Sequence, residues 1–266
     1  MDEISFLGAG SIAAAMVEGM IAKGAYAPGK IICMGGSGVS GPALSKRTGI
    51  RLAGSVEELL AGAGTLVVAF KPHQLAGADP RLGALTEGRL VISVLAGKKL
   101  DALARAFPRA RNIVRSMPNT PSQIGAGLTG WCSRAPLGAG DRTILDAVFG
   151  SLGLSIEIPE SKMDALTAIS GCGPAYVFEF AAALRDAGLG LGFDPATSKL
   201  LAVETLLGAA RLLARRDVDP EVLRGEVTSP NGVTAAGLRR MADLDFRGMI
   251  REAVVAARAR AEELSV

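Results

Sequence analysis

Short apolar runs alternate with segments of helical spacing over residues 1–159 of the chain. Such alternation is typical of a parallel sheet whose strands are joined by crossover helices. The runs that predict strands are Ile4–Leu7, Lys30–Met34, Thr65–Phe70, Leu90–Leu95 and Asn112–Met117. Two later runs, Ala126–Cys132 and Leu154–Ile158, flank a predicted helix near Gly140–Leu152 and are expected to complete the sheet.

The pattern changes after about Pro159, where long Ala- and Leu-rich segments carry apolar residues at helical spacing. The predicted helices lie near Lys162–Gly188, Asp194–Arg216, Asp219–Glu226, Thr234–Ala242 and Phe246–Leu264. Asp194 and Asp219 each precede a proline, which is typical of a helix N-cap followed by the first turn. The sequence therefore predicts an α/β protein, with a doubly wound sheet in residues 1–159 and an all-α domain in residues 160–266.

The predicted helical domain has more apolar surface than a small domain needs. Its long helices carry apolar residues on more than one face. Such a surplus usually ends in a subunit interface, and this is the interpretation we favour over a well-filled small bundle. The sequence thus predicts at least a homodimer.

The composition excludes several kinds of chemistry. His73 is the single histidine, so a multi-histidine metal centre is excluded, and no metal site is expected. The 29 Lys and Arg against 26 Asp and Glu are interspersed, and aromatic residues make up 4%, so nucleic acid is not an expected partner. The three cysteines, Cys33, Cys132 and Cys172, lie far apart and are expected to be reduced, and each is expected to be a small buried apolar residue.

The chain lacks the sequence patterns of membrane insertion or export. Its apolar runs, such as Leu66–Phe70, are far shorter than the roughly 20 residues that a membrane span requires. The start, MDEISFLGAG, is acidic where a signal peptide would be basic. We therefore expect a cytoplasmic protein with no membrane partner.

A glycine motif follows the first predicted strand and opens a helix that runs to about Lys23. The motif is Gly8-Ala9-Gly10-Ser11-Ile12-Ala13, a G-x-G-x-x-A pattern. Gly8 is expected to allow the tight turn, Gly10 to let a pyrophosphate approach the backbone, and Ala13 to permit close packing of helix on strand. Because a strand precedes the motif and a second strand follows the helix, the context is that of a dinucleotide-binding Rossmann domain.

The end of the second predicted strand favours NADPH over NADH. An NAD-preferring site places Asp or Glu there to bind the ribose 2′-hydroxyl. Here the segment is Met34-Gly35-Gly36-Ser37-Gly38, in which Ser37 is a candidate donor to a 2′-phosphate. Lys46 and Arg47 follow on a helix and are either further donors or a solvated face.

Two later turns are expected to complete the cofactor site, because ligands of open α/β sheets bind beyond the carboxyl ends of the strands. They are Phe70-Lys71-Pro72-His73 and Ser116-Met117-Pro118-Asn119-Thr120-Pro121. Lys71 is a candidate for a phosphate or ribose, and Asn119 for the nicotinamide. A lone His without a nearby carboxylate is more often a helix-start residue than a general acid, and we favour that interpretation of His73.

Two stretches in the helical half break the rules of helix formation. Residues 167–176, Thr-Ala-Ile-Ser-Gly-Cys-Gly-Pro-Ala-Tyr, place two glycines and a proline inside a helical pattern, which predicts a kink or a close approach of ligand to backbone. Residues 227–234, Val-Thr-Ser-Pro-Asn-Gly-Val-Thr, form a turn that leads into a short helix. Free amides around Asn231 to Thr234 and the Thr234 hydroxyl would make a cup for a carboxylate, whereas the alternative is an ordinary capped helix start.

Taken together, these motifs resemble the pyrroline-5-carboxylate reductase family in content and in order, from residue 4 to about residue 260. The resemblance implies NAD(P)H-dependent reduction of L-1-pyrroline-5-carboxylate to L-proline in the cytoplasm. It also implies a helical substrate-binding and dimerisation domain whose helices interlock with a partner chain, often in a ring such as a decamer.

The resemblance assigns roles to individual residues. It places Ser229, Asn231, Gly232, Val233 and Thr234 at the substrate carboxylate. It implies cofactor contacts for Gly8, Ala9, Gly10, Ser11, Ile12, Ser37, Phe70, Lys71, Pro72, Met117, Pro118 and Asn119. A hydroxyl, from Thr167 or Thr234, or a bound water would exchange the amine proton.

Three positions depart from the family pattern. Asn231 stands where Gly is usual, Cys172 where Ser is usual, and Val233 where Thr or a small residue is usual. Asn tolerates positive φ, so the loop is expected to keep its shape, whereas Val233 is expected to tighten the pocket. The alternatives are a reductase of a related cyclic imine, such as a piperideine carboxylate, and a non-catalytic NADP-binding regulator.

Overall fold

The computed structural model describes residues 2–35 and 38–265, which form two compact units. One unit holds the residues up to Cys172 together with the C-terminal stretch that begins at Ala257, and the other is Gly173–Ala256. The sequence places the boundary near residue 160, at the last strand. The packed unit continues further because Met163 is buried in the core beside the sheet.

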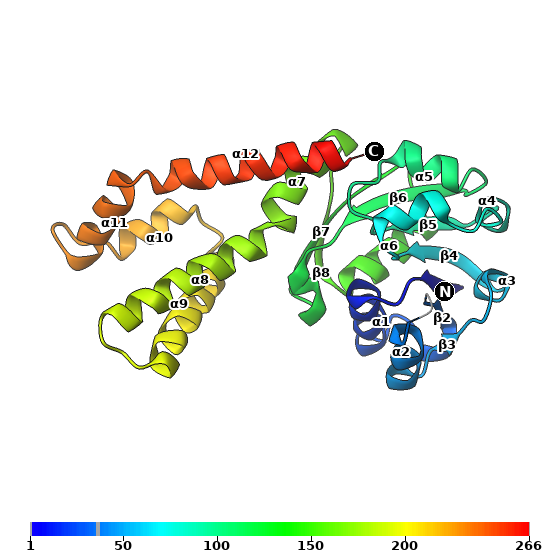
Figure 1. The fold of residues 1–266 in the computed structure, drawn as a ribbon, viewed down its shortest axis with the longest axis horizontal. Coiled ribbons are helices and arrows are strands. Elements are labelled where there is room, and N and C mark those ends of the chain that lie inside the picture. Colours follow the sequence, from blue (N-terminus) through cyan, green and yellow to red (C-terminus); the bar gives the residue numbers. More distant parts are fainter. Residues whose placement is uncertain (1, 36–37, 266) are drawn as a thin grey trace. The chain divides into compact units, whose positions relative to one another are not determined.

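In the described residues the first unit contains an eight-stranded sheet with the order β3-β2-β1-β4-β5-β6-β7-β8 (Figure 1). The strands are β1 Glu3–Leu7, β2 Ile31–Met34, β3 Arg51–Leu52, β4 Ala63–Val68, β5 Leu90–Ser93, β6 Asn112–Met117, β7 Gly127–Ser133 and β8 Gly153–Glu157. Neighbouring strands are parallel except for β6 and β7, which are antiparallel. The doubly wound α/β fold is therefore confirmed, and the chain's path reverses direction across the sheet between β1 and β4.

Helices cover both faces of the sheet. They are α1 Ser11–Ala22, α2 Ser40–Thr48, α3 Val56–Leu60, α4 Leu82–Leu85, α5 Leu100–Ala106, α6 Ala139–Gly150 and α7 Met163–Leu166. One core joins the sheet to α1 and α6, and a second joins it to α3 and α5. Strand β5 shows why its run is uniformly apolar: Val91 belongs to the second core, while Leu90 and Ile92 belong to the first.

Two features of the sheet are absent from the sequence prediction. Strand β3 is only Arg51–Leu52, too short and too exposed to give an apolar run. The reversal at β7 follows the tight connection Thr120–Ile124, a short 3-10 helix. This connection is too short for the crossover that a parallel neighbour of β6 would need, so the two strands pair antiparallel.

The predicted helix over 162–188 is broken at its first third. After α7 the backbone forms a π-helical turn, Thr167–Gly171, and helix α8, Gly173–Gly190, begins after it. The irregular stretch predicted from the two glycines and the proline is thus where the regular α-helix is interrupted. Single π turns of this kind are frequent at functional sites.

The second unit consists of α8, α9 Pro195–Arg216, α10 Pro220–Glu226, α11 Val233–Asp243 and most of α12 Phe246–Leu264 (Figure 1). Asp194 caps α9 as expected, because its carboxylate accepts from the amides of Ala196 and Thr197. Within the described part of the unit, α8, α10 and α11 bury none of their residues. Phe178, Leu191 and Val233 keep 63%, 80% and 93% of their surface exposed. The predicted surplus of apolar surface is therefore present.

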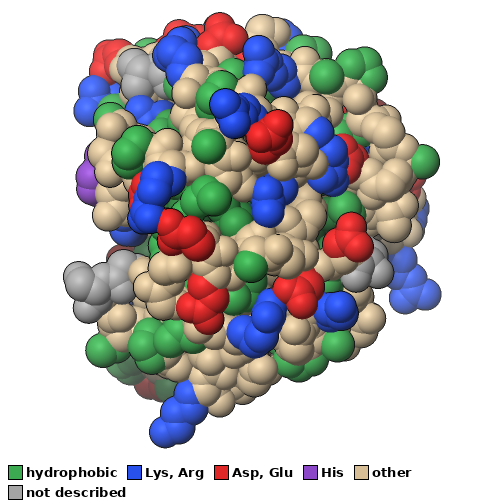
Figure 2. Space-filling view, turned by 90° about the vertical axis from the view of Figure 1, so that its right-hand side faces the viewer, with side chains coloured by type: hydrophobic (Ala, Val, Ile, Leu, Met, Phe, Trp, Pro, Cys, Tyr) green, Lys and Arg blue, Asp and Glu red, His purple; other side chains and the backbone are tan. Residues whose placement is uncertain are grey.

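Two of the three cysteines have the predicted burial. Cys33 and Cys132 are buried free thiols, whereas Cys172 is half-buried and differs from the prediction. Burial raises the pKa of Cys132 to about 11 and also raises the pKa of Cys33. On the face in Figure 2, basic and acidic side chains are interspersed. In residues 2–35 and 38–265 no helix has both the length and the apolar character that crossing a membrane demands.

The turn into β8 gives a sharp test of this sheet edge. Gly153 has φ +131°, and a Cβ on it would lie 2.3 Å from the Gly127 carbonyl oxygen. We expect Gly153→Ala to lower the free energy of unfolding by about 3 kcal/mol, because strain and a backbone clash add. The measurement is urea denaturation followed by circular dichroism.

Gly140→Ala is the matched control, because Gly140 lies in α6 and a Cβ there meets nothing within 4 Å. This substitution should be neutral or stabilising by up to about 1 kcal/mol. Equal stabilities of the two variants would contradict the account of the β7–β8 edge.

Candidate functional site

The turn between β1 and α1 is shaped by two glycines at the point where the chain's path reverses across the sheet. Gly8 has φ +119°, and a Cβ on it would lie 2.4 Å from the carbonyl carbon of Ala69. Only glycine therefore permits this approach to the end of β4. Gly10 is the N-cap of α1, and a Cβ there would meet nothing within 4 Å. The open space at Gly10 lies where a ligand group would approach the backbone.

The first turn of α1 offers amides to an anion. The N–H groups of Ser11 and Ile12 have no partner within the helix, and Ala13, 1% exposed, packs the helix closely onto the sheet. No acidic residue stands in this turn. Partial positive charge at the helix start therefore favours a diphosphate. Gly8, Ala9, Gly10, Ser11 and Ile12 thus fit the pyrophosphate of a dinucleotide.

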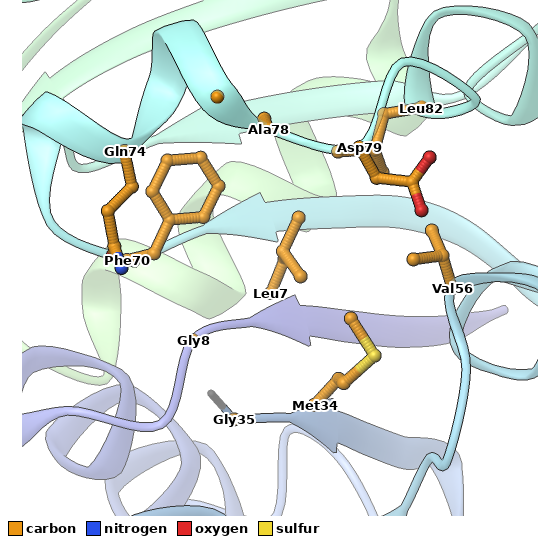
Figure 3. Close-up of a pocket in the computed structure, with 11 residues that line it drawn as sticks. Leu7, Gly8, Met34, Gly35, Val56, Phe70, Gln74, Ala78, Asp79 and Leu82 are labelled. Carbon is orange, nitrogen blue, oxygen red and sulfur yellow. The ribbon is translucent and has the colours of Figure 1, made fainter. Parts of the chain in front are cut away.

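A pocket of about 220 Å³ opens beside this turn, at the ends of β1, β2 and β4 (Figure 3). The side chains of Leu7, Met34 and Phe70 line it, and Gly8 and Gly35 lie at its edge. Its apolar lining and its place at the carboxyl ends of the strands suit the adenosine half of a dinucleotide.

Charged residues near this pocket are largely paired. Hydrogen bonds from Arg81 hold the pKa of Asp79, which lines the pocket, at about 2. Arg47 donates to Glu18 of α1 at 2.6 Å and its side chain is otherwise exposed. Ser37, the predicted donor to a 2′-phosphate, lies outside the described residues.

Lys71 and Pro72, in the turn after β4, have different surroundings. Lys71 is exposed, and its amide donates to the Gln74 side chain at 2.9 Å. Pro72 and His73 begin a 3-10 helix, Pro72–Gly77, so His73 is a helix-start residue as predicted. Both also line a second, larger cavity.

The turn after β6 is bonded to the π-helical turn. Asn119 donates from Nδ2 to the Ser170 carbonyl at 3.2 Å, and its Oδ1 accepts from the Leu128 amide at 3.0 Å. Its side-chain amide is therefore engaged within the protein, and the expected bond to the nicotinamide stays a prediction. Pro118 is buried next to it. Asn119 positions the π turn against the strands.

Met117, Gly171 and Thr167 lie together at this junction. A Cβ on Gly171 would lie 3.1 Å from Met117 Cε and 3.4 Å from Thr167 Cγ2. The Thr167 hydroxyl donates to the Met163 carbonyl at 2.8 Å. Its hydrogen is thus engaged, and its lone pairs are the part that a ligand can use, as an acceptor.

The larger cavity, about 540 Å³, brings Pro72 and Thr167 together. Gly97, after β5, and the C-terminal residues Leu264 and Ser265 also line it. The sequence prediction includes neither Gly97 nor the C-terminal end. Gly97 follows a strand and carries a turn signal, but nothing in the sequence places the end of the chain here.

Beside this cavity the buried Arg115 binds two carboxylates. Its side chain is 4% exposed and lies 3.1 Å from Glu160 and 3.1 Å from Asp164. Glu160 also accepts from the Leu100 amide at 2.7 Å. The sequence prediction does not include this cluster. The sequence signal for it is a charged residue, Arg115, inside the otherwise mostly apolar strand Asn112–Met117.

In the second unit, the loop before α11 has the predicted turn. Asn231 has φ +59°, so this non-glycine residue keeps the loop shape as expected. A Cβ on Gly232 would lie 2.3 Å from Ser229 Oγ and 3.2 Å from the Ser229 carbonyl oxygen, so Gly232 packs closely against Ser229. Gly232 donates its own amide to the Ser229 carbonyl at 3.1 Å, so it is not a free amide as we expected.

The free amides of this loop are instead those in the first turn of α11, beginning at Val233 and Thr234. Both side chains are exposed, Val233 by 93%. Helix α11 has eleven residues and no acidic residue in its first turn. The loop therefore offers an amide cup and a hydroxyl to a small carboxylate.

Both halves of the chain are similar to known protein families. Residues 160–264 match the model of pyrroline-5-carboxylate reductase dimerisation, and residues 3–97 match NADP oxidoreductase, coenzyme F420-dependent. The pyrroline-5-carboxylate reductase of Synechocystis is 36% identical over 98% of this chain and 98% of its own length.

Two solved structures share the fold. A pyrroline-5-carboxylate reductase from Coxiella burnetii has TM-score 0.93 and 32% identity, covering 100% of this chain and 99% of its own. Pyrroline carboxylate reductase of Plasmodium falciparum, with NADP bound, has TM-score 0.87 and 29% identity, covering 100% and 98%. On these similarities, the chain belongs to the pyrroline-5-carboxylate reductase family of NAD(P)H-dependent oxidoreductases.

Proposed function

We propose that this protein reduces L-1-pyrroline-5-carboxylate to L-proline with NADPH, the last step of proline biosynthesis. The main support is that this member of the family has two separate sites for anions. They are the glycine turn before α1 and the amide cup before α11. One suits a dinucleotide and the other a small carboxylate. NADH is the alternative cofactor.

The residues of the first unit hold the cofactor in this proposal. The turn Gly8–Ile12 binds the pyrophosphate through amides, and Phe70 borders the adenosine pocket. Met117, Pro118 and Pro72 shape the nicotinamide end, with Lys71 toward a phosphate or ribose. Asn119 acts by fixing the π turn. When bound, NADPH supplies the hydride that adds to the imine carbon.

The substrate carboxylate is held by the amides of Val233 and Thr234 and by the Thr234 hydroxyl, in the loop that Ser229, Asn231 and Gly232 shape. A cyclic imine accepts hydride readily once its nitrogen is protonated. The carboxylate anchor selects the ring face that is presented. Orientation of this kind lowers the barrier without a strong protein acid.

The hydroxyls of Thr167 and Thr234 are the proposed partners of the ring nitrogen. Thr167 donates to Met163, so it accepts the N–H of the protonated imine and thereby favours the charged, reactive form. Hydride adds to the imine carbon and forms a C–H bond. The C=N double bond thereby becomes the C–N single bond of a secondary amine, whose nitrogen keeps its hydrogen. The amine then takes one further proton from water.

The proposal includes a homodimer, or a ring of dimers such as a decamer, in the cytoplasm. The support is the exposed apolar surface of α8 to α12 and the dimerisation model that residues 160–264 match. Three free thiols suit a reducing compartment. We assign residues 1–159 to cofactor binding and 160–266 to substrate binding and dimerisation.

Steady-state assays test the proposal directly. We expect oxidation of NADPH that depends on pyrroline-5-carboxylate and yields proline in equal amount, with a higher kcat/KM for NADPH than for NADH. Piperideine carboxylate, the six-membered analogue, is the comparison substrate. Absence of imine-dependent oxidation with either cofactor would refute the enzyme and favour a non-catalytic NADP-binding regulator.

The amide cup gives a residue-level prediction. Thr234→Ala should raise KM for the imine more than tenfold and leave KM for NADPH nearly unchanged, because a hydrogen bond to a charged group contributes about 1.5–3 kcal/mol. The measurement is initial rates with each substrate varied in turn.

Thr228→Ala is the matched control on the same loop. The Thr228 hydroxyl donates to the Arg224 carbonyl at 2.5 Å and is not part of the proposed cup. Its KM for the imine should stay within about twofold of wild type. Unaltered imine kinetics in Thr234→Ala would refute the assignment of the cup.

A further inference from the structure

We propose that the C-terminal end of the chain, Leu264 with Ser265, is a specificity-determining wall of the cavity that contains Thr167, and that it limits the ring size of the imine. The inference rests on the proposed function. It assigns a role to a segment remote in sequence from every motif that we identified.

The backbone of this segment is fitted closely against the sheet. A Cβ on Gly97 would lie 2.7 Å from the Leu264 carbonyl oxygen, and Gly97 has φ +72°. Any other residue would strain the turn after β5 and push the segment away. The contact is thus a close approach of two backbones that requires glycine.

A buried polar network holds the segment in this position. Ser265 is 6% exposed, and its hydroxyl donates to Asp164 Oδ1 at 2.6 Å. Asp164 in turn lies 3.1 Å from the buried guanidinium of Arg115. A charge-assisted hydrogen bond from Ser265 therefore connects the end of the chain to strand β6.

The same network connects the segment to the proposed reaction site. Asp164 lies three residues before Thr167, and both line the cavity with Leu264. Leu264 keeps 55% of its surface exposed although it borders the cavity. If the ring nitrogen binds Thr167, the ring carbons extend into the cavity that Leu264 borders. They can then cover part of the Leu264 side chain that is exposed.

The chemistry of such a wall predicts its effect. An apolar pocket discriminates between ligands that differ by one methylene by roughly 10- to 200-fold. A five-membered and a six-membered imino carboxylate differ by one methylene. Because Leu264 is only partly covered, we expect its contribution to lie at the lower end of that range.

The experiment measures kcat/KM for pyrroline-5-carboxylate and for piperideine carboxylate in the full-length protein. We expect the ratio of kcat/KM for the six-membered imine to that for the five-membered imine to rise about tenfold in Leu264→Ala, which opens the cavity, and in Ser265→Ala, which releases the segment. The ratio should fall below wild type in Leu264→Trp, which fills the cavity.

Two controls separate the wall from general damage. Glu262→Ala alters the same helical turn at an exposed residue paired with Arg258, and it should leave the ratio unchanged. Ser265→Thr keeps the hydroxyl and should restore the wild-type ratio. KM for NADPH should stay within about twofold in all variants, which reports that the cofactor domain is folded.

The outcomes distinguish the two proposals. A wild-type protein inactive on both imines refutes the proposed function, and the wall with it. An active wild type whose ratio is unmoved by Leu264→Ala and Leu264→Trp refutes the wall alone. A ratio that moves equally in Glu262→Ala refutes it as well, because the effect would then belong to the helix end in general.

Discussion

The buried guanidinium of Arg115 is the constraint on which the arrangement around the Thr167 cavity depends. The Arg115 side chain is 4% exposed within a strand, so its charge needs carboxylate partners. Removing one partner of a buried ion pair lowers the free energy of unfolding by about 3–5 kcal/mol. Its partners, Glu160 and Asp164, come from the segment after the last strand. That segment is therefore held on the sheet, which fixes the start of the π turn with Thr167. Ser265 binds the same carboxylate, so the end of the chain is fixed too.

Close approaches of backbone to backbone determine the rest of the site. Gly8 lets the β1–α1 turn lie against the end of β4, and Gly97 lets the end of the chain lie against the turn after β5. A Cβ at Gly10 would meet nothing within 4 Å, so a phosphate can come close to the amides at the start of α1. The tight turn at Gly8 and the accessible backbone at Gly10 are the two features that the dinucleotide-binding turn needs.

Local patterns predicted the fold and the backbone of the site's turns, because short-range rules govern both. The strand–glycine–helix motif, the helix irregularity at 167–171 and the positive φ of Asn231 each depend on a few adjacent residues. Long-range contacts were not predictable in this way. The engagement of Asn119 with Ser170, the occupied amide of Gly232 and the position of Leu264 depend on tertiary packing. The extension of the first unit to Cys172 likewise depends on the Arg115 pairs rather than on periodicity.

The roles assigned to both units depend on the passage of hydride from the nicotinamide to the imine carbon of a carboxylated ring. This transfer can be followed by supplying NADPH deuterated at both C4 positions together with pyrroline-5-carboxylate, and by analysing the product with mass spectrometry and NMR. We expect L-proline with one deuterium, on the ring carbon bonded to nitrogen and remote from the carboxylate. Proline without that deuterium, or consumption of NADPH without proline, would show that no such transfer takes place.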